Sequence, residues 1–201
     1  MSDAVGSLHV TRRSLLASSA ASIAFAAEPV KLPQKVRVAV WGLDGHSGEF
    51  TKPLAQYPDV EIVGVYDANT KAAERYAKGK AKVFTDPRRM LDELKPDIAG
   101  IANNDGERAA AVLECANRKL HILAEKPLSI THPDLARVKK AVAANNVKLG
   151  LLLPMRFESP YLALKKIVES GEIGEVIQIS SQKSYQLGER PAWQRNRATY
   201  G

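Results

Sequence analysis

The sequence predicts an α/β fold, a doubly wound parallel sheet followed by the start of a second α/β unit. Two observations predict it: six short runs are apolar almost without interruption, and amphipathic stretches alternate with them. Such runs are typical of parallel strands covered by helices on both faces. The expected strands are 36–41, 60–67, 82–86, 97–103, 120–125 and 147–153. The expected helices are 47–57, 70–78, 87–94, 107–119 and 132–146.

The alternation changes at "LPMRFESPY", where the second unit is expected to begin. A helix over 159–170 and a strand over 175–186 are predicted there. One strand with polar alternation cannot cover its own edges and apolar face. It therefore pairs with another chain, or the rest of its sheet is missing, and we favour a truncated second domain. The predicted divisions are 1–27, a signal; 28–35, a linker; 36–153, the sheet domain; and 154–201, an incomplete domain.

The N-terminal segment carries the features of an export signal. Arg12 and Arg13 precede an apolar run of small residues that ends in the A-x-A-type sequence "AFA". This run is shorter than the roughly 20 residues that span a bilayer. The order of these features resembles a twin-arginine signal and predicts a periplasmic protein beginning near Ala27. The alternative is a disordered or weakly helical N-terminus with a chance arginine pair.

Composition excludes several classes of function. The 201 residues are 45% hydrophobic and 25% charged, and the net charge is +7. The basic residues are dispersed among acids and lack the aromatic interleaving of a nucleic-acid groove, so no nucleic-acid partner is expected. Cys115 is alone and no histidines share metal-ligand spacing, so we expect neither a disulfide nor a metal site.

The loop after the first expected strand, "WGLDGHSGEF", resembles a dinucleotide-binding turn. Its glycines are Gly42, Gly45 and Gly48, whereas the usual fingerprint is G-x-G-x-x-G. Asp44 stands where the second glycine is expected. We expect its carboxylate to point away from a bound pyrophosphate or to cap the following helix, with Gly45 and Gly48 supplying the turn and the close helix packing. His46 is a candidate donor to a phosphate.

Asp67 ends the second expected strand, 19 residues beyond Gly48, which is near the spacing expected of a carboxylate that binds a ribose. A carboxylate there bonds a ribose 2′-hydroxyl and repels a 2′-phosphate, which favours NAD over NADP as cofactor. The alternative is an aspartate that forms a turn or caps a helix.

The sequence "AEKPL" follows the fifth expected strand and places Glu125 and Lys126 at the ligand-binding edge. A lysine ammonium there can anchor a sugar hydroxyl and stabilise alkoxide character when hydride leaves the adjoining carbon. From these residues alone a solvated Glu-Lys turn is the better interpretation, and Lys126 becomes the candidate catalytic residue through the family resemblance that follows. Pro127 is compatible with a cis peptide.

The glycine loop, "AEKPL" and the later "SGEIGEV" together resemble the glucose–fructose oxidoreductase and inositol dehydrogenase (Gfo/Idh/MocA) family over residues 36–187. The resemblance implies a Rossmann domain that binds NAD or NADP, with Lys126 near nicotinamide and substrate. It also implies a second domain with a mostly antiparallel sheet and a frequent oligomer interface. Candidate cofactor ligands are Gly42, Gly45, His46, Gly48, Asp67, Asn103, Glu125 and Lys126.

Three departures from the family pattern stand out besides the altered loop. Asn103, Asn104 and Asp105 replace a usual Thr-Pro-Asn, and Arg108 holds the place of a usual histidine. The family's acid–base Asp and His would lie beyond Gly201. The predicted function is NAD-dependent oxidation of a sugar or polyol hydroxyl. The alternatives are an exported NAD-dependent glycosidase of the same family and a nucleotide-binding remnant without turnover. No membrane partner is expected after signal cleavage, and a complete second domain would make a homo-oligomer.

Overall fold

The computed structural model describes residues 31–184, 186 and 188–200. Six parallel strands form one sheet in the order β3-β2-β1-β4-β5-β6. The strands are β1 (Val36–Trp41), β2 (Val60–Tyr66), β3 (Lys82–Phe84), β4 (Ile98–Ile101), β5 (His121–Ala124) and β6 (Leu149–Leu151). Each lies within its predicted range. The strand order reverses between β1 and β4, so a ligand crevice is expected at their carboxyl ends.

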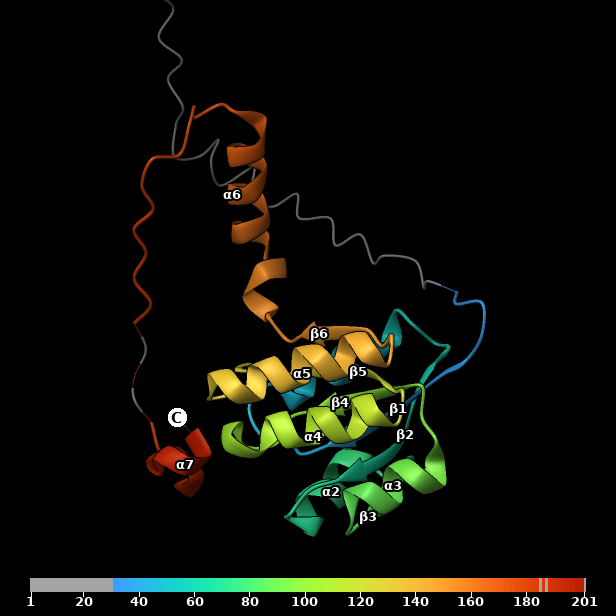
Figure 1. Ribbon diagram of the computed structural model, residues 1–201. Coiled ribbons are helices and arrows are strands. Elements are labelled where there is room, and N and C mark those ends of the chain that lie inside the picture. Colours follow the sequence, from blue (N-terminus) through green and yellow to red (C-terminus); the bar gives the residue numbers. More distant parts are fainter. Residues whose placement is uncertain (1–30, 185, 187, 201) are drawn as a thin grey trace, which may run out of the picture.

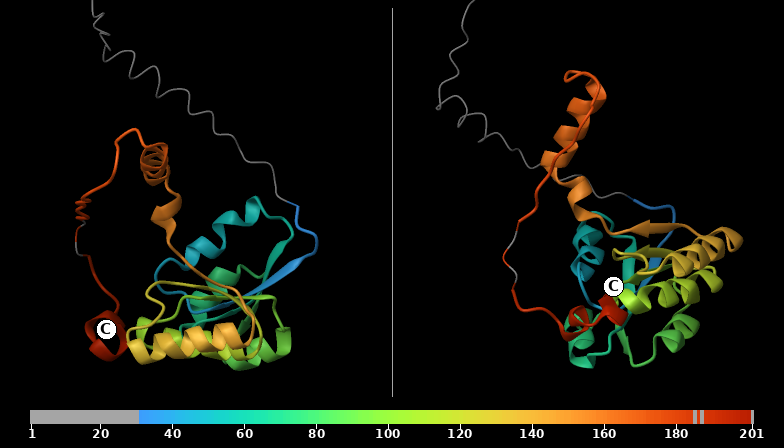
Figure 2. Two further views of the ribbon diagram at one scale, coloured as in Figure 1. Left: turned by 45° about the horizontal axis from the view of Figure 1, so that its top comes forward. Right: turned by 60° about the vertical axis from the view of Figure 1, so that its left-hand side comes forward.

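Helices cover both faces of this sheet, as Figures 1 and 2 show. The covering helices are α2 (Thr70–Ala77), α3 (Pro87–Leu94), α4 (Asp105–Asn117) and α5 (His132–Ala144). Two further helices do not cover the sheet: α6 (Ser159–Ser170) extends away from it with every residue exposed, and α7 (Arg197–Tyr200) lies at its edge. Short 3-10 helices are η1 (Ser47–Phe50), η2 (Lys52–Ala55), η3 (Pro154–Phe157) and η4 (Ala192–Arg195).

Side chains that alternate along β1 divide the core into two layers. Ala39 packs in the layer formed with α3, α4 and α5, whereas Val38 and Val40 pack in the layer that contains Phe50 of η1. Period-two alternation sends successive side chains to opposite faces of a strand, and here both faces are buried. The doubly wound architecture is therefore confirmed.

The helices over 70–78, 87–94, 107–119 and 132–146 are confirmed to within two residues at their starts and ends, and each begins at a capping side chain. The Asn69 side chain accepts from Ala72 N, and the Asp86 side chain accepts from Arg88 N just before Pro87. Such caps satisfy amide groups that have no partner inside the helix. The sequence therefore sets these helix starts locally.

The helix predicted over 47–57 is wrong, because η1 and η2 replace it. Pro53 has no N–H to donate to the carbonyl four residues earlier, so an α-helix cannot run through this position unbroken. The loop after β1 therefore leads into two single 3-10 turns.

The strand predicted over 175–186 is also wrong for the described residues, and they contain no antiparallel second sheet. Ile177 and Ile179 are 93% and 80% exposed. A strand needs a neighbour for its backbone groups, and none of the described segments supplies one here. The helix over 159–170 is confirmed as α6.

The predicted export signal lies outside the described residues. No described helix combines the length and apolarity that a membrane span requires. The described residues also contain no group of three His, Cys, Asp or Glu side chains placed to hold a metal ion.

Candidate functional site

The turn after β1 is held between the ends of two neighbouring strands. Gly42 N donates to Tyr66 O of β2 at 2.7 Å, and Asp44 N donates to Ala102 O at the end of β4 at 2.7 Å. Gly42 has φ +86°, and a Cβ there would lie 2.5 Å from Asn103 N. Only glycine allows this conformation and this approach without strain. The loop is thereby fixed at the crevice between β1 and β4.

Glu125 connects this loop to the end of β5. The residue is 2% exposed, and its Oε1 accepts from His46 N at 3.1 Å and contacts His46 Nδ1. Oε2 accepts from Lys126 N at 3.0 Å. A Cβ on Gly45, which has φ +60°, would lie 2.5 Å from Glu125 Oε1. The carboxylate that was predicted to touch a cofactor therefore braces the loop and the lysine turn together.

Asp67 lies directly after β2 with both carboxylate oxygens engaged. Oδ2 accepts from Leu43 N and Oδ1 accepts from Asn69 N, each at 2.8 Å. The bond to Asn69 N is that of an aspartate turn, so Asp67 does form the turn that the sequence analysis gave as its alternative role. Each oxygen has a second lone pair, and the fixed carboxylate can still accept a hydroxyl.

Arg108, which the sequence marked only as a departure from a family pattern, is the main buried cation of the site. Its side chain is 1% exposed, and Nη1 donates to Asp105 Oδ1 at 2.8 Å and to Pro127 O at 2.7 Å. Its Nη2 donates to Asn103 O. One guanidinium thus joins the loops that follow β4 and β5. Its spacing of three residues from Asp105 on one helix was the available signal.

Two further predicted residues lie at the same edge. Asn103 is 8% exposed, and its Oδ1 has no hydrogen-bond partner among the described atoms. Lys126 is exposed, and its ammonium has no ion-pair partner among the described residues. The Lys126–Pro127 peptide is cis. The structure thereby gathers a free acceptor and an exposed ammonium beside the glycine loop.

Comparison with known proteins identifies this arrangement. Residues 36–152 match the Gfo/Idh/MocA description "Oxidoreductase family, NAD-binding Rossmann fold". The chain belongs to this family. It is 25% identical to myo-inositol 2-dehydrogenase of Thermotoga maritima over 151 residues, which cover 73% of this chain and 45% of that protein. The chain thus spans less than half the length of this curated relative.

Solved structures agree with this membership. A Thermotoga maritima structure superposes with a TM-score of 0.76 at 28% identity, covering 82% of this chain and 53% of that one. The WlbA dehydrogenase from Bordetella pertussis, solved with NADH and UDP-GlcNAcA, superposes with a TM-score of 0.65 at 26% identity. That match covers 70% of this chain and 44% of WlbA.

Asp44 is the main irregularity of this Gfo/Idh/MocA loop. Its Oδ1 accepts from the indole Nε1 of Trp193 at 3.1 Å. Burial raises the pKa of its carboxyl, the Trp193 hydrogen bond lowers it, and nearby Asp67 raises it again. The predicted alternative, that Asp44 caps the next helix, is wrong, since η1 begins at Ser47, its N-cap residue is His46, and no side chain caps it.

Gly48 differs from the other two loop glycines of this family member. A Cβ there would meet no described atom within 4 Å, and its φ lies outside the left-handed region. The predicted need for close helix packing at Gly48 is therefore wrong, because the 3-10 turn leaves open space beside it.

Proposed function

We propose that the protein is an NAD-dependent oxidoreductase that oxidises a sugar or polyol hydroxyl by hydride transfer. The observation that carries this proposal is the gathering of the glycine loop, Asp67, Asn103 and Lys126 at the carboxyl edge of a 3-2-1-4-5-6 sheet. This edge is where doubly wound sheets bind their ligands. The names of the relatives, an inositol dehydrogenase and a dehydrogenase solved with NADH and UDP-GlcNAcA, support the same reaction class.

The residues present fit a dinucleotide. Gly42 and Gly45 hold the loop close to Asn103 and Glu125 at the crevice, and a Cβ on Gly48 would meet no described atom within 4 Å, so a pyrophosphate can approach the backbone there. The buried Asn103 Oδ1, which lacks a partner, is suited to accept from a ligand N–H or O–H. Both features are compatible with NAD, which when bound supplies the hydride acceptor.

Asp67 favours NAD over NADP. Two backbone amides hold its carboxylate at the end of β2, where the adenosine ribose of a dinucleotide lies in such sheets. A fixed negative charge at this point accepts a ribose hydroxyl and repels a 2′-phosphate.

Lys126 is assigned to the substrate. Its backbone N–H is held by Glu125 and its turn by the Arg108 bond to Pro127 O, while its ammonium faces solvent. A positioned cation beside the substrate oxygen stabilises the negative charge that develops there. Glu125 and Arg108 therefore act as positioning residues for this ammonium.

The test is NAD binding followed by turnover. Calorimetric titration of the purified chain with NAD and NADP should show binding, with NAD preferred, and Asp67→Asn should reduce that preference. Turnover is then measured as net NADH formation from an inositol or a free sugar. In this assay Lys126→Ala should lower the rate at least ~100-fold with little change in NAD affinity. Lys139→Ala, an exposed lysine on α5, is the control and should match wild type.

Other results have distinct meanings. Release of an aglycone from a glycoside without net NADH would indicate the glycosidase alternative. Absence of NAD binding at millimolar nucleotide would reject the proposal.

We also propose export by the twin-arginine route, which Arg12, Arg13 and the apolar run after them support. A fusion of residues 1–35 to a reporter should reach the periplasm, and substitution of both arginines by lysine should retain it in the cytoplasm.

A further inference from the structure

Asp44 lies among other acids at the cofactor loop. Asp67 and Asp105 both act on its carboxyl to disfavour the charged form, and Arg108 acts in the opposite sense. Asp44 also stands at the fingerprint position whose glycine normally lets the backbone approach a pyrophosphate. Like charges at short range repel, so this position needs a group that turns the carboxylate aside.

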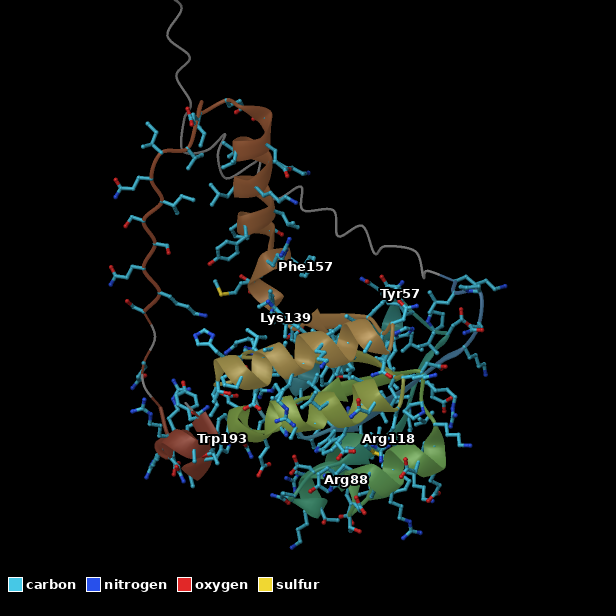
Figure 3. All side chains as sticks on the ribbon, viewed as in Figure 1. Tyr57, Arg88, Arg118, Lys139, Phe157 and Trp193 are labelled. Carbon is cyan, nitrogen blue, oxygen red and sulfur yellow. The ribbon has the colours of Figure 1, made fainter. Side chains whose placement is uncertain are left out.

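That group comes from the far end of the chain. The Asp44–Trp193 hydrogen bond joins residues 149 positions apart. The indole N–H is a donor only, so the bond fixes the carboxylate toward the 191–200 segment. Figure 3 shows Trp193 on this segment, beside the N-terminal end of α4.

The 191–200 segment is ordered around this tryptophan. Thr199 Oγ1 donates to Trp193 O at 2.6 Å, and the rings of Trp193 and Tyr200 lie 5.7 Å apart between centroids. A Cβ on Gly106, in the first turn of α4, would lie 2.2 Å from Ala198 O. The backbone of the segment thus approaches the carboxyl edge as closely as a glycine permits, and Figures 1 and 2 show α7 at this edge.

We propose that the Asp44–Trp193 contact docks the 191–200 segment onto the cofactor loop and couples docking to dinucleotide binding, so that each favours the other. The coupling rests on the proposed NAD function. A bound pyrophosphate favours the state in which Asp44 is turned toward Trp193, because that state separates the two negative charges. Thermodynamic linkage then requires the docked segment to raise NAD affinity by the same factor.

The test is a double-mutant cycle in the full chain. The sequence has two tryptophans, so Trp41→Phe leaves Trp193 as the only indole, and a phenyl ring keeps an aromatic partner for Tyr66. In this background, calorimetry measures the NAD affinity of four proteins: the background itself, Asp44→Ala, Trp193→Phe and the variant that carries both substitutions. Trp193→Phe should weaken NAD binding about fivefold or more when Asp44 is present. It should change binding by about twofold or less with Asp44→Ala.

Trp193 emission is the second readout. Asp44→Ala should shift it without nucleotide, and NAD should shift it further only when Asp44 is present. Equal losses of affinity in both backgrounds would overturn the coupling, as would tighter binding by Trp193→Phe, which would mean that the segment occludes the loop. If no variant binds NAD, the coupling fails together with the proposed function. A dependence of Trp193 emission on Asp44 would then still establish the docking contact.

Discussion

Gly45→Ala is expected to destabilise the fold, whereas the same substitution at Gly48 is expected to be tolerated. An alanine at φ +60° costs about 1–2 kcal/mol in backbone energy. Its Cβ would also lie 2.5 Å from Glu125 Oε1, so this buried carboxylate must withdraw. Withdrawal removes the bond from His46 N, and a hydrogen bond to a charged group contributes about 1.5–3 kcal/mol. Together the two contributions predict a loss of about 2.5–5 kcal/mol in the free energy of unfolding.

Urea unfolding followed by circular dichroism measures this loss, with Gly48→Ala as the matched control. Gly48 lies three residues along the same loop, where a Cβ meets no described atom within 4 Å. The control should stay within about 0.5 kcal/mol of wild type or gain slightly, since alanine suits a helical turn better than glycine. Equal midpoints for the two variants would refute the bracing function assigned to Glu125.

Three further predictions concern buried or half-buried groups. Burial raises the pKa of the Cys115 thiol to about 12, so a maleimide should label the native protein only as fast as it unfolds; labelling at the rate of a free thiol would contradict this burial. Burial, the largest influence, raises the pKa of Asp44 above its unfolded value of roughly 3.9. The folded state therefore keeps its full stability at pH values below the unfolded pKa, where the carboxyl is protonated, and loses stability as pH rises through the folded pKa and the buried carboxylate ionises. Asp44→Asn should therefore raise the urea midpoint at neutral pH and leave it nearly unchanged at pH values below the unfolded pKa of roughly 3.9. An equal gain at both pH values would show that ionisation of the Asp44 carboxyl is not the cause. Arg108→Met should cost about 3–5 kcal/mol of unfolding free energy because it leaves Asp105 buried without its cation, and a loss below about 1 kcal/mol in urea unfolding would argue against the buried pair.

The sheet could be predicted because its signals are local. Apolar runs and caps such as Asn69 and Asp86 act within a few residues of where they occur. The same reasoning failed over 47–57, where the apolar spacing outweighed Pro53 although the missing N–H decides the outcome. It failed again over 175–186, because a strand depends on a partner that local sequence does not reveal.

In the site too, the positions of residues could be predicted, whereas contacts between distant segments could not. The positions of Asp67 and Lys126 follow from the strands that precede them, and the structure brings both to one edge. The contacts of Glu125 and Arg108 could not be predicted from the sequence, because each side chain bonds to a loop that follows a different strand. The partner of Asp44 was beyond prediction altogether, since no pattern relates it to Trp193.

The Glu125 carboxylate has a consequence for attempts to change cofactor preference by engineering. It holds His46 through one oxygen and the amide of Lys126 through the other. A transplanted glycine loop that lacks a histidine at position 46 would therefore lose the side-chain contact to this carboxylate, and a displaced carboxylate would shift the lysine turn. Substitutions at 45 and 46 should be non-additive with substitutions at 125 and 126. Cofactor loop and lysine turn are best exchanged as one cassette.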